Sequence, residues 1–155
     1  MACIEGLKVI SMETVDLLRN LMRAFDKNIG ALEKTQLACC GATIGQCHAV
    51  MEIGLAGQIS LIDLANVLNL DKSTMSRTVN GLVENEWIER ITDPEKRRYV
   101  KLTLSPKGQL LHEQISSVLN AYFGNIMKDI PENKREQVAE SLELLLHALN
   151  KNDCC

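Results

Sequence analysis

The fold is decided by residues 60–84, which read SLIDLANVLNLDKSTMSRTVNGLVE. Ser60 and Asp71 are residue types that favour the N-cap position, where a side-chain oxygen accepts a hydrogen bond from the first turn of a helix. Behind each cap, apolar residues recur at the three- and four-residue steps of an amphipathic helix. These inward positions are Leu61, Leu64, Ala65 and Leu68 in the first helix and Met75, Val79, Leu82 and Val83 in the second. The stretch therefore predicts two short helices joined by about three residues, as in a helix-turn-helix.

After Trp87 the apolar period changes from helical to alternating. Residues 88–92 and 100–104 have the pattern of two strands, and the Asp-Pro pair between them, at Asp93, favours a turn. We expect a β-hairpin with a charged tip. A helix-turn-helix followed by such a hairpin is the winged variant of the motif, whose second helix enters the major groove of DNA.

Longer helices are expected on both sides of this segment. An apolar stripe predicts a first helix from Val9 to Leu32, and the capping box Thr43-Ile-Gly-Gln46 predicts a second that ends near Gly57. Serine followed by proline at residues 105–106, and proline at residue 131, predict the starts of two more. We expect a single chain, 1–155, that is mainly α with a small β-hairpin wing. A DNA-binding lobe would cover residues 43–104, with dimerisation helices at 7–35 and 106–151.

The composition fits this fold class and excludes others. With 155 residues, 46% hydrophobic and 24% charged, the chain resembles an ordinary globular domain. Aromatic residues make up only 3%, which favours a helical core of aliphatic side chains. The sequence has no candidate membrane span or signal peptide, so we expect a cytoplasmic protein without a membrane partner. Phosphate-binding loops and catalytic motifs are also missing from the sequence, which disfavours an enzyme.

Basic residues gather where the motif lies, although the net charge of the chain is −3. Between Lys72 and Lys101 there are seven basic residues and five acidic ones. Arginine suits guanine, asparagine suits adenine, and short hydroxyls suit phosphates or bases. The candidate DNA contacts are Lys72, Ser73, Thr74, Ser76, Arg77 and Asn80 on the second helix, with Lys96, Arg97 and Arg98 on the hairpin tip.

The middle third of the chain resembles the MarR family of bacterial transcriptional regulators. The stretches that carry the resemblance are LIDLANVL at residues 61–68, DKSTMSR at 71–77, GLVENEWIER at 81–90, DPEKRR at 93–98 and LTLSPKG at 102–108. The resemblance implies a bacterial or archaeal homodimer that sets one winged lobe on each half of a pseudo-palindromic double-stranded operator. It also implies that Asp93 and Arg97 support the wing.

Six cysteines suggest how such a regulator could sense its effector, since a cytoplasmic compartment would keep them reduced. Cys47 falls near the start of a capped helix, where the macrodipole favours a thiolate, and Cys39 and Cys40 precede that helix. Three thiolates suit arsenic(III), and a fourth ligand would suit zinc, cadmium or mercury. The fourth ligand could be His48, Cys154 or Cys155. We therefore predict a repressor whose DNA affinity changes when a soft metal or metalloid binds.

Other interpretations remain open at this stage. The effector could be a phenolic or aromatic compound, or the thiols could respond to oxidation. From a different functional class, the chain could be a helical protein-interaction module that does not bind DNA. A DNA affinity that falls steeply with salt would separate the regulator from the interaction module.

Overall fold

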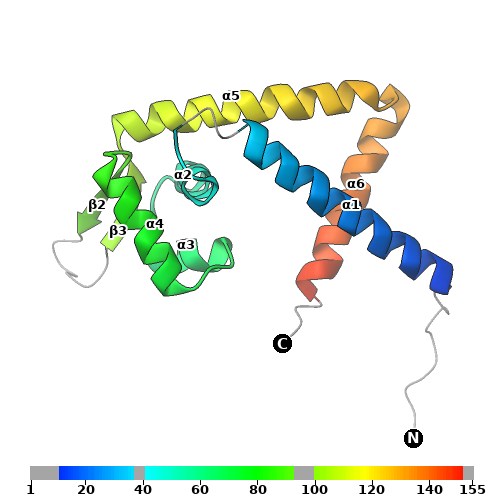
Figure 1. The fold of residues 1–155 in the computed structure, drawn as a ribbon, viewed down its shortest axis with the longest axis horizontal. Coiled ribbons are helices and arrows are strands. Elements are labelled where there is room, and N and C mark those ends of the chain that lie inside the picture. Colours follow the sequence, from blue (N-terminus) through cyan, green and yellow to red (C-terminus); the bar gives the residue numbers. More distant parts are fainter. Residues whose placement is uncertain (1–10, 37–40, 93–99, 152–155) are drawn as a thin grey trace, which may run out of the picture.

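The computed structural model describes residues 11–36, 41–92 and 100–151. Its elements, shown in Figure 1, are α1 (Met12–Gln36), α2 (Ile44–Ala56), β1 (Ile59–Ser60), α3 (Leu61–Val67), α4 (Lys72–Glu84), β2 (Ile88–Thr92), β3 (Val100–Leu104), α5 (Pro106–Asp129) and α6 (Glu132–Lys151). The predicted order of helices and strands is confirmed, and the chain is mainly helical with a small sheet.

The predicted helix caps fix the starts of the lobe helices. Thr43 and Gln46 form both bonds of the capping box at α2, with Gln46 N to Thr43 Oγ1 at 3.2 Å and Thr43 N to Gln46 Oε1 at 2.9 Å. Ser60 accepts a hydrogen bond from Asp63 N at α3, and Asp71 accepts one from Thr74 N at α4. These bonds satisfy N–H groups that a helix start otherwise leaves without partners.

The turn between α3 and α4 is closed by backbone bonds. Leu70 N donates to Ala65 O at 2.9 Å, across Asn69, which has a φ of 55°. Asparagine tolerates this left-handed conformation better than most residues, and it ends the helix as glycine often does. The short turn sets α4 across α3, as the helix-turn-helix requires.

The sheet has three antiparallel strands in the order β1-β3-β2. Two of them, β2 and β3, form the predicted hairpin, with Ile88 opposite Leu104 and Arg90 opposite Leu102. The third strand, β1, was not predicted, because two residues are too short to show an alternating pattern. It pairs Ile59 with Leu102 and thereby ties the start of α3 to the wing.

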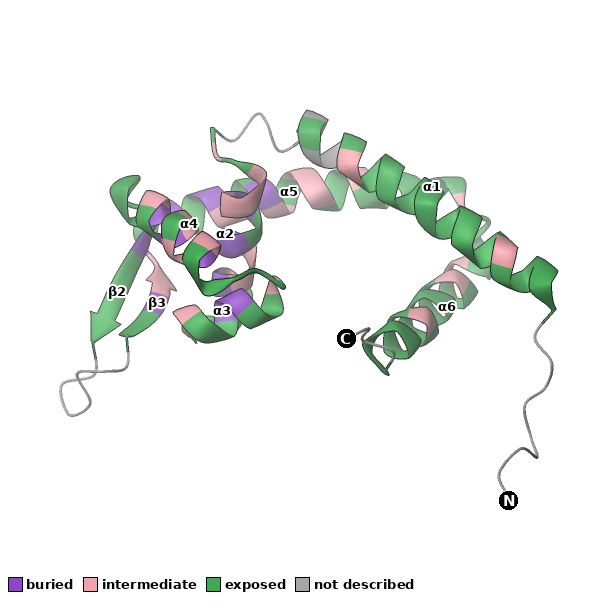
Figure 2. Cartoon of the chain, turned by 60° about the horizontal axis from the view of Figure 1, so that its bottom comes forward, coloured by how far each residue is buried: buried purple, intermediate pink, exposed green. Residues whose placement is uncertain are grey.

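One hydrophobic core fills the lobe and extends under the first half of α5. Figure 2 shows the buried residues gathered there, away from α1 and α6. The fully buried large side chains are Ile53, Leu64, Met75, Leu82, Leu102, Ile115, Val50, Val79 and Cys47. The inward stripe predicted for α4 is therefore confirmed at Met75, Val79 and Leu82, whereas Val83 is 36% exposed. The prediction for Val83 was wrong because this residue lies about 100° around the helix from Leu82, at the edge of the buried stripe.

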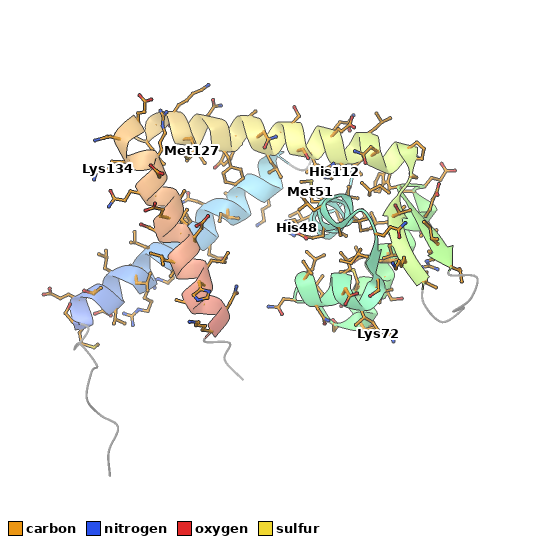
Figure 3. The ribbon with its side chains drawn as sticks, turned by 180° about the vertical axis from the view of Figure 1, so that it is seen from behind. His48, Met51, Lys72, His112, Met127 and Lys134 are labelled. Carbon is orange, nitrogen blue, oxygen red and sulfur yellow. The ribbon has the colours of Figure 1, made fainter. Side chains whose placement is uncertain are left out.

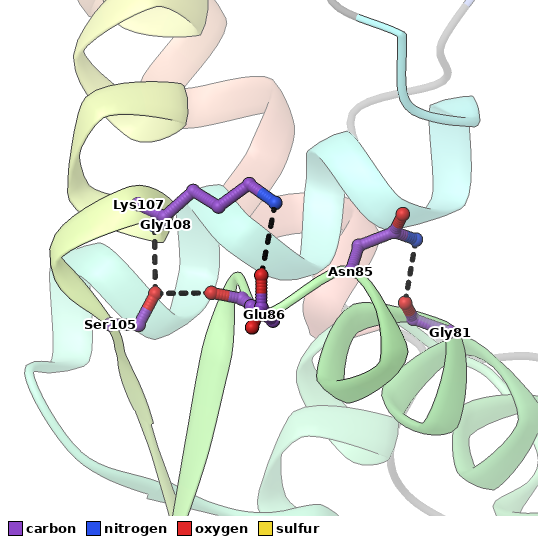
Figure 4. A network of polar contacts seen from close by, with 6 residues as sticks. All are labelled: Gly81, Asn85, Glu86, Ser105, Lys107 and Gly108. Carbon is purple, nitrogen blue, oxygen red and sulfur yellow. Dashed lines mark hydrogen bonds and ion pairs between the residues drawn. The ribbon is translucent and has the colours of Figure 1, made fainter.

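The lobe joins α5 through a tight polar junction, drawn in Figure 4. Ser105 Oγ donates to Glu86 O at 2.6 Å and accepts from Gly108 N at 3.0 Å. Glu86 is the second residue after the end of α4 and has a φ of 61°. Lys107 Nζ lies 3.5 Å from its carboxylate. One buried serine thus caps α5 and also holds the chain that leaves α4, so the two helices are coupled directly.

The second part of the molecule is helical and open. In Figure 1, α5 runs from the lobe toward α6, and α1 crosses α6 away from the lobe. No residue of α6 is buried, and no described side chain of α1 is buried either. Within the described residues, no helix is long and apolar enough to cross a membrane.

Candidate nucleic-acid interface

The outer face of α4 carries a stripe of polar residues. Met75, Val79 and Leu82 take its inner face into the core, so the opposite face is turned to solvent. The exposed residues there are Lys72, Ser73, Arg77 and Asn80, and Thr74 and Ser76 are partly buried at its edge. Lys72 lies at the tip of the lobe, on the side away from α5 (Figure 3). This face of α4 is therefore open to a partner.

Thr74 is engaged at the start of the helix. Its hydroxyl donates to Asp71 Oδ2 at 2.6 Å and its backbone N–H donates to Asp71 Oδ1 at 2.9 Å. The Thr74 hydroxyl and then its backbone N–H hold the pKa of the Asp71 carboxyl below its usual range. Thr74 thus fixes the first turn of α4, which contains Ser73, and Arg77 follows one turn later.

Arg77 lies along its own helix. Its Nη2 is 3.4 Å from Ser73 Oγ and its Nε is 3.5 Å from Ser73 O, both long for such bonds. Within the described residues, no carboxylate lies within ion-pair distance of Arg77. Its guanidinium is therefore exposed, weakly held and positively charged.

Asn80 has a closer partner, which the sequence analysis missed. Arg90 on β2 donates from Nη2 to Asn80 Oδ1 at 2.6 Å, so the wing and α4 are joined across their outer surface. The strand pattern carried only part of the signal, namely the face of β2 on which Arg90 lies. Arg90 is two residues beyond the buried Ile88, so both side chains leave β2 on the face that looks toward α4.

The hairpin tip lies outside the described residues. Asp93, Lys96, Arg97 and Arg98 belong to it, so their predicted roles in DNA contact and wing support stay predictions. The strands that lead to the tip are described, and they carry the exposed basic residues Arg90 and Lys101.

Only two of the predicted sensing residues, Cys47 and His48, are described. Cys47 is fully buried in the lobe core, whereas His48, its neighbour on α2, is exposed. Cys39, Cys40, Cys154 and Cys155 lie outside the described residues. Among residues 11–36, 41–92 and 100–151, no three His, Cys, Asp or Glu side chains come together as a metal site would require. The thiol prediction therefore rests mainly on residues outside the described ranges.

A large apolar surface lies away from the lobe, where α1 faces α6. It contains a hollow of about 580 Å³. Apolar lining residues are Met22, Phe25, Ile29, Phe123, Leu142, Leu145, Leu146 and Leu149. Phe25 is 48% exposed and Leu146 is 60% exposed. An apolar surface of this kind marks an interaction site in a folded protein.

Comparisons with known proteins agree on one family. The model of the MarR family matches residues 42–100. The chain is 26% identical over 112 residues to the HTH-type transcriptional regulator BilQ of Clostridium symbiosum, which covers 72% of this chain and 78% of that protein. It is 33% identical over 72 residues to the multiple antibiotic resistance protein MarR of Salmonella typhimurium, covering 46% of this chain and 50% of that protein. The crystal structure of Streptococcus pneumoniae FabT in complex with DNA has the same fold, with a TM-score of 0.77 at 21% identity over 88% of this chain and 98% of that one.

Proposed function

Because the chain belongs to the MarR family through residues 42–100, we propose that it binds operator DNA as a homodimer and represses transcription in response to an effector. The family consists of DNA-binding transcriptional regulators rather than enzymes, as the absence of catalytic motifs led us to expect. The observation that carries the proposal is the exposed polar stripe of α4 above a buried apolar face. In a winged helix-turn-helix, this helix enters the major groove.

The residues on α4 divide by what they can recognise. Arg77 is the candidate base reader, since a guanidinium donates two hydrogen bonds to the O6 and N7 atoms of guanine. Lys72 and Ser73, at the start of the helix, suit phosphate oxygens. Lys96, Arg97 and Arg98 of the hairpin tip would enter the flanking minor groove.

The homodimer is supported by the apolar surface of α1 and α6. Leucine and phenylalanine side chains there would stay in water in a single chain, at a cost of about 25 cal/mol for each Å² of apolar area. A symmetric pair covers such a surface on both copies at once and presents two lobes, as two operator half-sites require. DNA-binding function and dimerisation thus use separate parts of the chain.

The effector is proposed to be a soft metal or metalloid bound by thiolates. Its support is the grouping of Cys39 and Cys40 before the capped helix α2 and of Cys154 and Cys155 at the other end of the chain. Cys47 could join them only if the first turns of α2 opened, because its sulfur lies in the core. A phenolic effector is the alternative, and it leaves the cysteines without a role.

Metal titration of the reduced protein separates the two effectors. Arsenite, zinc, cadmium or mercury should give a thiolate absorption band and release DNA, and the Cys39→Ser/Cys40→Ser variant should lose both effects. Cys47→Ala is studied separately, because a change in the core affects folding as well as ligation. DNA release that survives loss of Cys39 and Cys40 would rule out the thiolate site.

DNA binding itself is tested with duplexes that the wild-type chain selects from a random-sequence pool. We expect an affinity that falls steeply with salt. Arg77→Ala should weaken binding at least about fivefold and relax the preference for one guanine, and Arg98→Ala should weaken binding to all duplexes. Lys134→Ala is the matched control, because Lys134 is exposed at the end of the molecule away from the lobe (Figure 3). Failure of the wild-type chain to select any duplex would contradict the proposal.

A further inference from the structure

The exposed pair of Asn80 and Arg90 lies where a DNA backbone would have to pass. Asn80 is on the outer face of α4 and Arg90 is on β2, and a hydrogen bond of 2.6 Å joins them. When α4 occupies a major groove and the wing occupies the neighbouring minor groove, the sugar-phosphate strand between the two grooves runs across the angle between α4 and β2. The two side chains line that angle.

The pair presents hydrogen-bond donors toward this strand. Arginine carries five N–H donors and no acceptor, and the bond to Asn80 uses only one of them. The carbonyl oxygen of Asn80 accepts that bond, and the NH₂ group of the same amide adds two further donors. Phosphate oxygens only accept hydrogen bonds, so the chemistry of the pair matches a phosphate.

The charge of Arg90 is also available. The described ion pairs join Arg19 to Asp16 and Lys107 to Glu86, and within the described residues no carboxylate neutralises Arg90. Ile88 and Arg90 lie on the same face of β2, but Ile88 is buried and Arg90 is exposed. The Arg90 side chain therefore lies at the edge of the core. Among the described residues its hydrogen-bond partner is Asn80, and this bond fixes the direction of the side chain without cancelling its charge.

We infer that Arg90 is a phosphate-contact residue of the DNA interface and that Asn80 is the positioning residue that holds it there. This inference rests on the proposed function and revises one expectation. Recognition of adenine requires the amide oxygen of asparagine to accept a bond from the base, and here a positively charged donor lies against that oxygen. Asn80 therefore acts through Arg90 rather than by reading a base.

The test uses the full chain and a duplex selected by the wild-type protein, with affinity measured over a range of salt concentrations. Each phosphate contact contributes about −0.9 to the slope of log K against log salt. Arg90→Ala should therefore make the slope of the dimer shallower by about 1.8, and should weaken binding at least about tenfold at moderate salt. Arg90→Lys keeps the charge but not the planar fork, so it should weaken binding while keeping the wild-type slope.

Two further variants separate positioning from structure. Asn80→Ala should weaken binding with an unchanged slope and an unchanged preference among selected duplexes, and the loss in the double variant should not exceed that of Arg90→Ala. A neutral methylphosphonate in place of the contacted phosphate should weaken DNA binding by the wild-type protein and leave DNA binding by Arg90→Ala unchanged. Lys134→Ala should match the wild type throughout.

The outcomes that overturn the inference are distinct from those that overturn the function. If Arg90→Ala keeps the wild-type salt slope while Arg77→Ala still binds DNA weakly, the phosphate contact of Arg90 is refuted and the DNA-binding function stands. A changed sequence preference in Asn80→Ala would return Asn80 to base reading and overturn its positioning role. A wild-type chain that selects no duplex would overturn both conclusions.

Discussion

The junction between the lobe and α5 makes Gly108 the most sensitive of the glycines that the structure describes. A Cβ atom at this position would lie 1.8 Å from the backbone oxygen of Trp87 and 2.8 Å from its carbonyl carbon. Both are backbone atoms, so no side-chain rotation can relieve the contact. The start of α5 and the chain after α4 would have to separate by about 1 Å or more.

The magnitude of the Gly108→Ala effect follows from three contributions. Overpacking of this kind costs about 1–3 kcal/mol. Separation also stretches the bond from Ser105 N to Trp87 O, now 3.0 Å, and a typical hydrogen bond contributes about 1 kcal/mol. Alanine recovers up to about 1 kcal/mol of helix propensity. With the full gain in helix propensity, we expect a net loss of about 1–3 kcal/mol in the free energy of unfolding.

Gly45→Ala is the matched control for this variant. Gly45 also lies in the first turn of a helix, α2, and nothing is within 4 Å of the position of its added Cβ. Urea unfolding followed by circular dichroism should show Gly108→Ala destabilised and Gly45→Ala equal to the wild type or more stable. Equal stability of the two variants would refute the reasoning about the junction.

Three other results are expected. Replacement of Asp71 by Asn should lower stability at neutral pH, and the difference should vanish in acid. The folded state lowers the pKa of the Asp71 carboxyl, so the ionised carboxylate stabilises the fold above about pH 4, and this stabilisation is lost as the pH falls through the lowered pKa. A stability difference between Asp71→Asn and the wild type that does not change with pH would contradict this. Cys47 should resist alkylation in the native protein and react in urea, because its side chain is buried, and peptide mass spectrometry can follow the reaction. Rapid alkylation of Cys47 in the native protein would show that it lies outside the core. Phe25→Glu should halve the mass measured by sedimentation, whereas Ile62→Glu should leave it unchanged, because Ile62 is exposed on α3 in the lobe. If both variants keep the wild-type mass, the apolar surface of α1 and α6 is not the dimer interface.

Local signals in the sequence were enough to predict the framework of the lobe. The helix caps at Thr43, Ser60 and Asp71 each bond to a residue three positions later, so a local sequence pattern is enough to predict them. The strand β1 depends on pairing with β3 some forty residues later, and no local pattern encodes that contact.

The candidate site was predictable only in part for the same reason. The outward positions of Lys72, Ser73 and Arg77 follow from helical spacing alone. The bond between Asn80 and Arg90 depends on how α4 and β2 pack together. Cys47 shows the opposite case, because its place near the start of α2 suggested a reactive thiol and the packing of the lobe buries it.

Protection of guanine N7 atoms from methylation tests the central claim most directly, since these atoms face the major groove. On a duplex selected by the wild-type chain, we expect two protected patches about 10 base pairs apart, and Arg77→Ala should lose protection in both. A single patch, or protection that persists in Arg77→Ala, would contradict a paired major-groove contact by α4.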